Sequence, residues 1–136
     1  MRVRQRTVRT LLYVWAGPTT LVGLLAGGLT LATRGSVQHR RGALEFHGGF
    51  AHWFLSRQIV SASAMTLGHV ILGRDPFCLE RCRDHEQAHV RQVERWGPLF
   101  LPAYASASLW AFLRGSNFYF DNWFERDARR ACGSLD

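Results

Sequence analysis

The longest uncharged stretch of this chain, residues 10–33, restricts its possible folds more than any other feature. The stretch holds no acidic or basic side chain and is followed by Arg34. As one α-helix it would be about 36 Å long at roughly 1.5 Å per residue, enough to cross a hydrocarbon core of about 30 Å. A secretory signal peptide is a second interpretation, although the stretch has no convincing cleavage site. Gly17-Pro18 and Gly27-Gly28 also permit a kinked or hairpin segment that never crosses fully.

Arginine supplies all the positive charge of the chain, since the net charge is +7 and there is no Lys. Arg binds phosphate well, whether in lipid headgroups or in nucleic acid. Five Trp and nine Phe beside these arginines are more typical of a protein at a membrane surface. The sequence has no helix-turn-helix, zinc-finger or RNA-binding strand motif. We therefore expect membrane lipids as partners and no nucleic acid.

Residues 35–74 have the composition of short strands. Ala43–His47 is predicted to form one strand that ends at two glycines, and residues 64–73 a second. In the second, four side chains alternate onto one face: Met65, Leu67, His69 and Ile71. Two such strands before a helix predict a small antiparallel hairpin or the edge of a sheet. Three histidines here belong to no spacing motif, and we expect surface or hydrogen-bonded roles for His47, His52 and His69.

A helix with distinct start and stop signals follows. Asp75 suits the N-cap and Pro76 the first helical position, while Gly97-Pro98 suits the end. Residues 76–96 are therefore predicted to form a helix about 30 Å long. Near its middle, residues 85–89 read His-Glu-Gln-Ala-His, an HExxH motif.

The HExxH motif indicates a zinc site. On a helix, His85 and His89 are one turn apart and point the same way, so their Nε2 atoms should lie about 3–3.5 Å apart around one Zn²⁺. Glu86 can then act as the general base that takes a proton from zinc-bound water. The alternative is a polar helix whose histidines face solvent or cap a core. Cys78 and Cys82 share the same helix stripe, but about 16 Å of rise separates Cys78 from His89, which excludes a single Cys₂His₂ site.

Two further segments complete the chain. Residues 98–113 form a second apolar block that is about 24 Å long as a helix, which is short for a simple crossing. It is interpreted as a short transmembrane helix, a re-entrant helix or a buried core helix. Residues 117–136 begin with aromatic side chains and continue as a charged helix that Asp121 or Asn122 can cap.

A zinc hydrolase commonly has three protein ligands, and the third is not in the motif. One class places a His six residues after the second motif His, but Arg95 occupies that position. The other class takes a carboxylate from a later helix, and the downstream acids are Glu94, Asp121, Glu125, Asp127 and Asp136. We select Glu125, with Asp121 and Asp127 next, because residues 98–113 can return the chain alongside the motif helix. The alternative is an exposed ion pair between Glu125 and Arg129.

At these residues the chain resembles the gluzincin group of zinc metallopeptidases, in which HExxH is followed by a Glu on a later helix. The resemblance covers His85–His89 and Phe124–Ala131. More closely, HEQAHVRQVERWGPLFLPAY looks like short bacterial membrane proteins of the form HExxHxxQ…GPLYLP…FE. The resemblance implies a zinc cofactor held by His85, His89 and Glu125, with Glu86 as the catalytic base. Membrane gluzincins often carry an Asp four residues after the ligand Glu, where this chain has Arg129.

Taken together, the patterns predict a mainly α-helical protein with a small antiparallel β-hairpin. Its helices would be an N-terminal transmembrane or membrane-embedded helix, the HExxH helix, a second apolar helix and a C-terminal helix. Residues 1–34 would form a basic N-terminus and membrane anchor, and residues 35–136 a small metal-binding domain.

The expected function is zinc-dependent hydrolysis of a peptide or protein at a membrane, by resemblance the bacterial inner membrane, with the metal site on the cytoplasmic side. The alternative is a non-catalytic membrane protein with a structural or vestigial metal site. Tyr104, Tyr119 and His69 are candidates for stabilising an oxyanion. The strand at residues 64–73 could pair with an extended peptide by edge addition.

Overall fold

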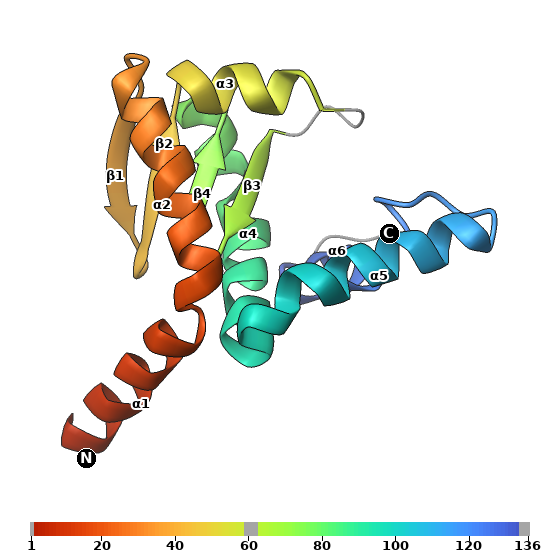
Figure 1. Cartoon of the computed structure of the whole chain (residues 1–136), viewed down its shortest axis with the longest axis horizontal. Coiled ribbons are helices and arrows are strands. Elements are labelled where there is room, and N and C mark those ends of the chain that lie inside the picture. Colours follow the sequence, from red (N-terminus) through yellow and green to blue (C-terminus); the bar gives the residue numbers. More distant parts are fainter. Residues whose placement is uncertain (1, 59–62, 134–136) are drawn as a thin grey trace.

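The computed structural model describes residues 2–58 and 63–133. In Figure 1 a small sheet is surrounded by helices, with α1 and α5 extending away from it. The elements in chain order are α1 (Arg2–Trp15), α2 (Gly17–Ala32), β1 (Ser36–Arg40), β2 (Ala43–His47), α3 (Gly49–Ser56), β3 (Ala64–Leu67), β4 (Val70–Gly73), α4 (Pro76–Trp96), the 3₁₀ turn η1 (Gly97–Leu99), α5 (Phe100–Leu113) and α6 (Trp123–Ala131).

The sheet is larger than the expected hairpin and mixed in direction. Its strand order is β1-β2-β4-β3, with antiparallel β1–β2 and β3–β4 pairs and a parallel β2–β4 pair at the centre. The predicted single strand over residues 64–73 is wrong, because the chain reverses at Gly68, where φ is +67°. Gly68 also packs so closely on α2 that a Cβ there would lie 2.5 Å from the backbone nitrogen of Thr20.

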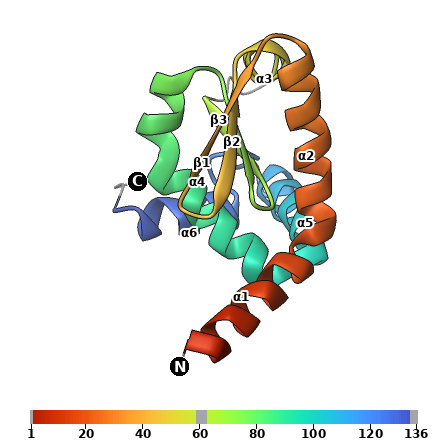
Figure 2. The same ribbon diagram turned by 90° about the vertical axis from the view of Figure 1, so that its left-hand side faces the viewer.

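Helices cover both faces of the sheet (Figure 2). On one face, α4 contributes Leu79 and Val90 to a core shared with strand residues such as Ile71. On the other face, α2 and α3 enclose a core that includes Phe46 and Leu72. A sheet buried on both sides explains why β4 is apolar and buried at every position.

The apolar stretch at residues 10–33 forms two helices instead of one straight helix. Among the described residues no single helix combines the length and apolarity needed to cross a membrane. The helices α1 and α2 meet that test only jointly, and they are bent by 67° relative to each other. The kinked interpretation therefore describes this stretch, and the break falls at Ala16, just before Gly17-Pro18. Pro18 removes a backbone donor at the start of α2, which favours a new helix start there.

The helix α2 packs directly against the sheet. Its buried residues are Thr19, Gly23, Gly27 and Thr30. A Cβ on Gly27 would lie 2.5 Å from the ring of Phe46 in β2, so only glycine allows this approach. The boundary expected after residue 34 thus separates two parts that are packed together.

The C-terminal half places α6 beside α4. The predicted end signals of α4 are confirmed, because the Asp75 carboxylate accepts a hydrogen bond from the Cys78 nitrogen at 2.7 Å and Gly97 adopts φ +57°. After η1 and α5 the chain returns, and a buried cluster of Val93, Phe100 and Phe124 joins the three helices. Asn122 is the N-cap of α6, as one of the two predicted candidates.

Candidate metal centre

Two histidines of α4 converge at the site. His85 and His89 lie one turn apart, and their Nε2 atoms are 3.2 Å from each other. This distance falls in the range expected for two nitrogens around one zinc ion, about 3–3.5 Å. The interpretation of the motif as a solvent-facing polar helix is therefore wrong for His89, whose side chain is only 6% exposed.

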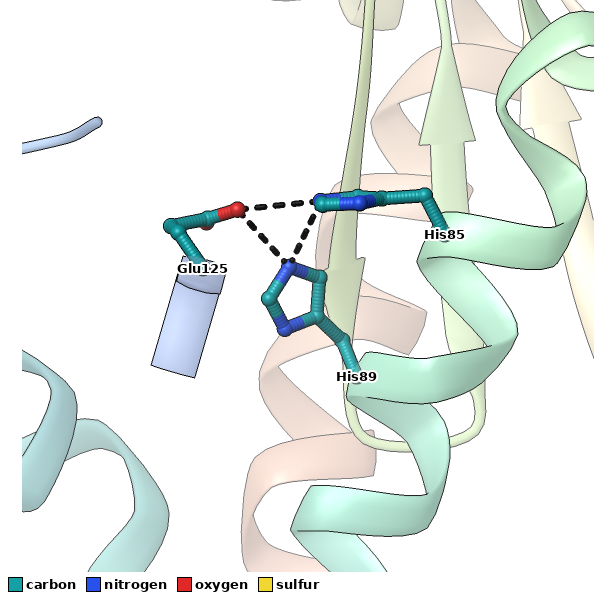
Figure 3. Close-up of side chains that lie close together, drawn as sticks. All are labelled: His85, His89 and Glu125. Carbon is teal, nitrogen blue, oxygen red and sulfur yellow. Dashed lines mark hydrogen bonds and ion pairs between the residues drawn. The ribbon is translucent and has the colours of Figure 1, made fainter. Parts of the chain in front are cut away.

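Glu125 of α6 completes the group (Figure 3). Its Oε2 atom lies 2.9 Å from His85 Nε2 and 3.2 Å from His89 Nε2. The candidate ligand atoms of the three residues all lie within 4.8 Å of one another, so the group could hold a metal ion. An exposed ion pair between Glu125 and Arg129 is not formed, because the Glu125 side chain is 5% exposed and the Arg129 guanidinium donates to the Phe120 carbonyl.

The electrostatics of the group favour a cation between the three side chains. Burial alone would raise the pKa of Glu125, but hydrogen bonds with His85 and His89 outweigh burial and hold that pKa well below its usual range. Burial would lower the pKa of His89, but its hydrogen bond and proximity to Glu125 raise that pKa to about 9. Burial would also lower the pKa of His85, but the hydrogen bond with Glu125 helps to raise that pKa above its usual value. A divalent ion can supply the positive charge that the protons otherwise supply.

Gln92 fixes the orientation of His89. The side-chain Nε2 of Gln92 donates to the Phe124 carbonyl at 2.9 Å and to the Asp127 carboxylate at 2.8 Å. Both partners only accept, so the amide oxygen of Gln92 must face His89, and it lies 2.8 Å from His89 Nδ1. His89 therefore donates through Nδ1, and Nε2 is the ring nitrogen that faces His85 and Glu125. Outer hydrogen bonds of this kind are usual for metal-binding histidines.

Glu86 lies next to the group and is held by the sheet. It is 5% exposed, and the Thr66 hydroxyl of β3 donates to its Oε2 at 2.6 Å. The sequence does not single out Thr66. The alternation of side chains along the strand places Thr66 only on the face opposite Met65 and Leu67. Nothing in the local pattern shows that this face meets α4.

An apolar cavity of about 130 Å³ opens beside Glu86, His89 and Glu125. It is lined by β3 on one side and by Phe100, Leu101 and Tyr104 of α5 on the other. Since β3 is an edge strand of the sheet, the cavity runs along a strand with one unpaired side. The cavity can admit an apolar side chain next to the carboxylate and imidazole groups.

Of the three candidates for oxyanion stabilisation, two lie at the site and one does not. Tyr104 and Tyr119 both line the cavity, and the Tyr104 hydroxyl donates to Glu125 Oε1 at 2.6 Å. Burial first, and then the charge of Glu125, raise the pKa of both tyrosines, so their hydroxyls stay protonated and can donate. His69 does not reach the site, because its Nε2 pairs with Glu94 at 2.8 Å and its ring stacks on Tyr13.

The remaining candidates also lie elsewhere. Asp121 accepts a hydrogen bond from the Asn117 nitrogen in a turn, Glu94 pairs with His69, and Asp136 falls outside the described residues. Within residues 2–58 and 63–133, Cys78, Cys82 and Cys132 form no disulfide with one another, and Cys78 and Cys82 are near the core between the sheet and α4. This agrees with the exclusion of a Cys₂His₂ site.

The chain matches no family model, and no curated protein or solved structure is similar to it. Function is therefore argued from the geometry of the site itself.

Proposed function

We propose that this protein is a zinc-dependent peptide hydrolase of gluzincin type, with His85, His89 and Glu125 as metal ligands. The observation that carries this proposal is the meeting of three buried or half-buried ligand atoms beside Glu86 at the edge of an apolar cavity. Two imidazoles and one carboxylate form the ligand set of many catalytic zinc sites, which leave a fourth position for water. Bound zinc would lower the pKa of that water and polarise the carbonyl of a substrate.

Each residue then has a role set by its position. Glu86 accepts the proton of the attacking water and later transfers it to the leaving amine, and the Thr66 hydroxyl keeps its carboxylate in place. Gln92 holds His89 in the tautomer that offers Nε2. Tyr119 lines the cavity and keeps its proton, so it is available to donate to a developing oxyanion.

The substrate is inferred from the walls of the cavity. An extended peptide could hydrogen-bond along the free edge of β3 while an apolar side chain enters between Leu67 and Phe100. This arrangement favours peptides with an apolar residue next to the cleaved bond.

The test compares Glu86→Gln with Glu125→Ala. Glu86→Gln should keep stoichiometric zinc and lose hydrolysis of a fluorogenic peptide by at least about 10²-fold, because general base catalysis contributes about 10²–10⁴-fold. Glu125→Ala should lose the zinc as well as the activity. Asp121→Ala serves as the matched control, since Asp121 only supports a turn, and should keep both.

The result that contradicts the proposal is wild-type protein that binds zinc but does not cleave a diverse peptide library. The non-catalytic alternative would then be correct, with a structural metal. Wild-type protein without any zinc affinity would contradict both the hydrolase and a structural metal, and would favour a vestigial site.

A further inference from the structure

The helix α2 has the reverse of the polarity expected for a helix at a water-exposed surface. Its buried face consists of Gly and Thr, whereas its outward face consists of aliphatic side chains that are 42–67% exposed: Leu21, Val22, Leu24, Leu25, Leu29 and Leu31. A surface helix normally turns its apolar side chains to the core and its polar ones to water. Small residues toward the protein and leucine outward are instead typical of helices in contact with lipid.

A second helix, α5, has apolar side chains on every face and no charged one, with Tyr104, Ser106 and Ser108 as its polar residues, and yet it is largely exposed. Only Phe100 and Ala111 are buried, while Leu109, Trp110, Phe112 and Leu113 are 57–69% exposed. Helices that are apolar on every side occur in protein cores or in membranes. The 14 residues of α5 extend for about 21 Å, which is shorter than the roughly 30 Å hydrocarbon core and suits one leaflet.

The two apolar helices lie on the same side of the molecule. In Figure 2, α2 and α5 are on one side of the sheet, while α6 and the first turns of α4 are on the other. Figure 1 shows the same two helices running in different directions across that side. We refer to the exposed apolar side chains of α2 and α5 together as the apolar surface.

The segments that precede or follow α2 and α5 in the chain are positively charged. Exposed arginines occur in α1 (Arg4, Arg6 and Arg9) and directly after α2 and α5 (Arg34 and Arg114). No acidic residue precedes Glu45, and none lies between Glu94 and Asp121. Both apolar helices therefore lie in stretches whose only charges are positive, which is complementary to anionic lipid headgroups.

We propose that the outward faces of α2 and α5 lie among the acyl chains of one leaflet of a bilayer that contains anionic lipids. In this arrangement α1 and the bordering arginines contact the headgroups, and no helix crosses the bilayer. A second copy of the chain fits less well, because even the cores of protein interfaces are only about 65% apolar, whereas the outward face of α2 has no hydrogen-bonding side chain. If the proposed hydrolase function holds, the cavity beside α5 opens near the membrane surface, and substrates reach it from there.

The experiment measures partitioning of the full chain onto vesicles by flotation. The vesicles contain phosphatidylcholine with or without phosphatidylglycerol. The variants are Leu25→Gln on α2 and Phe112→Gln on α5, with Phe77→Gln as the matched control. Phe77 is 68% exposed, similar to Leu25 at 67% and Phe112 at 64%, but it lies in the first turn of α4, across the sheet from α2.

Leu25→Gln and Phe112→Gln should each lower partitioning by about tenfold or more, because each removes a large apolar side chain from the acyl region. Phe77→Gln should leave partitioning unchanged, and omission of phosphatidylglycerol should weaken binding of every variant. Zinc content, measured in parallel, should be the same in all variants. Failure of zinc binding would thus contradict only the hydrolase proposal.

Equal partitioning of all three variants would overturn the lipid-facing surface. So would a lipid-free dimer that Leu25→Gln dissociates, since a second copy would then cover the surface.

Discussion

The side-chain amide of Gln92 joins His89 to Asp127, accepting from one through its oxygen and donating to the other through its nitrogen. Asp127, two residues after Glu125, is thus connected to His89 through this one amide. The sequence did not indicate this connection.

Loss of this connection should weaken metal binding. We expect Gln92→Met to lower zinc affinity by about 10–100-fold, because loss of outer hydrogen bonds to metal-binding histidines has effects of that size. Competition with a chromophoric chelator measures the affinity. Gln87→Met is the control on the same helix, because no partner of the Gln87 side-chain nitrogen is found within residues 2–58 and 63–133. Equal affinities of the two variants would show that Gln92 does not orient His89.

The Thr66 hydroxyl should matter for hydrolysis and not for zinc content. Thr66→Val keeps the shape of the side chain and removes the hydrogen bond to Glu86. We expect kcat to fall by about 5–13-fold, which corresponds to roughly 1–1.5 kcal/mol for one buried hydrogen bond. Thr66→Ser should retain most of the activity. A Thr66→Val protein with unchanged kcat would mean that Glu86 is positioned by other contacts.

Stability and zinc affinity should depend on pH in opposite ways. In metal-free protein the pKa of His89 is raised from 6.5 to about 9, so the folded state holds a proton that the unfolded state releases. The stabilisation from this proton is complete below pH 6.5 and is lost as pH rises toward 9. Glu125 has the opposite sign, because its pKa is lowered and its contribution disappears as pH falls below 4.5.

Zinc binding requires deprotonated imidazoles, so zinc affinity should rise over the interval in which metal-free protein loses stability. Urea unfolding between pH 6 and pH 9, with and without zinc, measures both trends. His89→Ala should reduce both trends, because His85 alone would then hold a raised pKa beside Glu125. Trends of equal sign with and without zinc would contradict the assignment.

Adjacent glycines of α2 provide a test of its packing. A Cβ at Gly27 would overlap the Phe46 ring, whereas a Cβ at Gly28 would meet nothing within 4 Å. Gly27→Ala should lower the free energy of unfolding by about 1–3 kcal/mol through overpacking. Gly28→Ala should be neutral or stabilising by up to about 1 kcal/mol, because Ala favours helix more than Gly. Similar values for the two variants would show that α2 does not contact β2 as described.

Local signals were sufficient for the motif helix and its ends. Asp75 and Gly97 delimit α4 through their own backbone and side-chain chemistry, and the spacing of His85 and His89 follows from the helix repeat. Glu125 could be selected because few acids follow the motif and the intervening segment is long enough to return. These inferences need only the sequence near each residue and a simple constraint on chain length.

Tertiary contacts account for what the sequence did not indicate. The parallel pairing of β2 with β4 joins strands separated by α3 and β3, and no local pattern encodes it. Thr66 and Gln92 belong to no sequence motif, and their contacts form only because α4 packs against β3 and α6. Asn122 was expected only as a cap, yet its side chain also donates to the Tyr104 carbonyl and to Ser108 of α5.

The contact of Glu125 with His85 joins residues that are 40 positions apart in the chain. A metal ion at that point would act as a reversible cross-link, closing a loop that contains η1, α5 and the start of α6. Such a closure restricts the unfolded chain much as a disulfide does, with a gain that grows slowly with loop length. The nine-residue α6 is too short to be stable as an isolated helix, so its attachment would depend on the state of this closure. Removal of metal would then loosen the part of the cavity wall that α6 forms while the sheet stays folded. Hydrogen exchange of the backbone amides would therefore rise in α6 before it rises in the sheet.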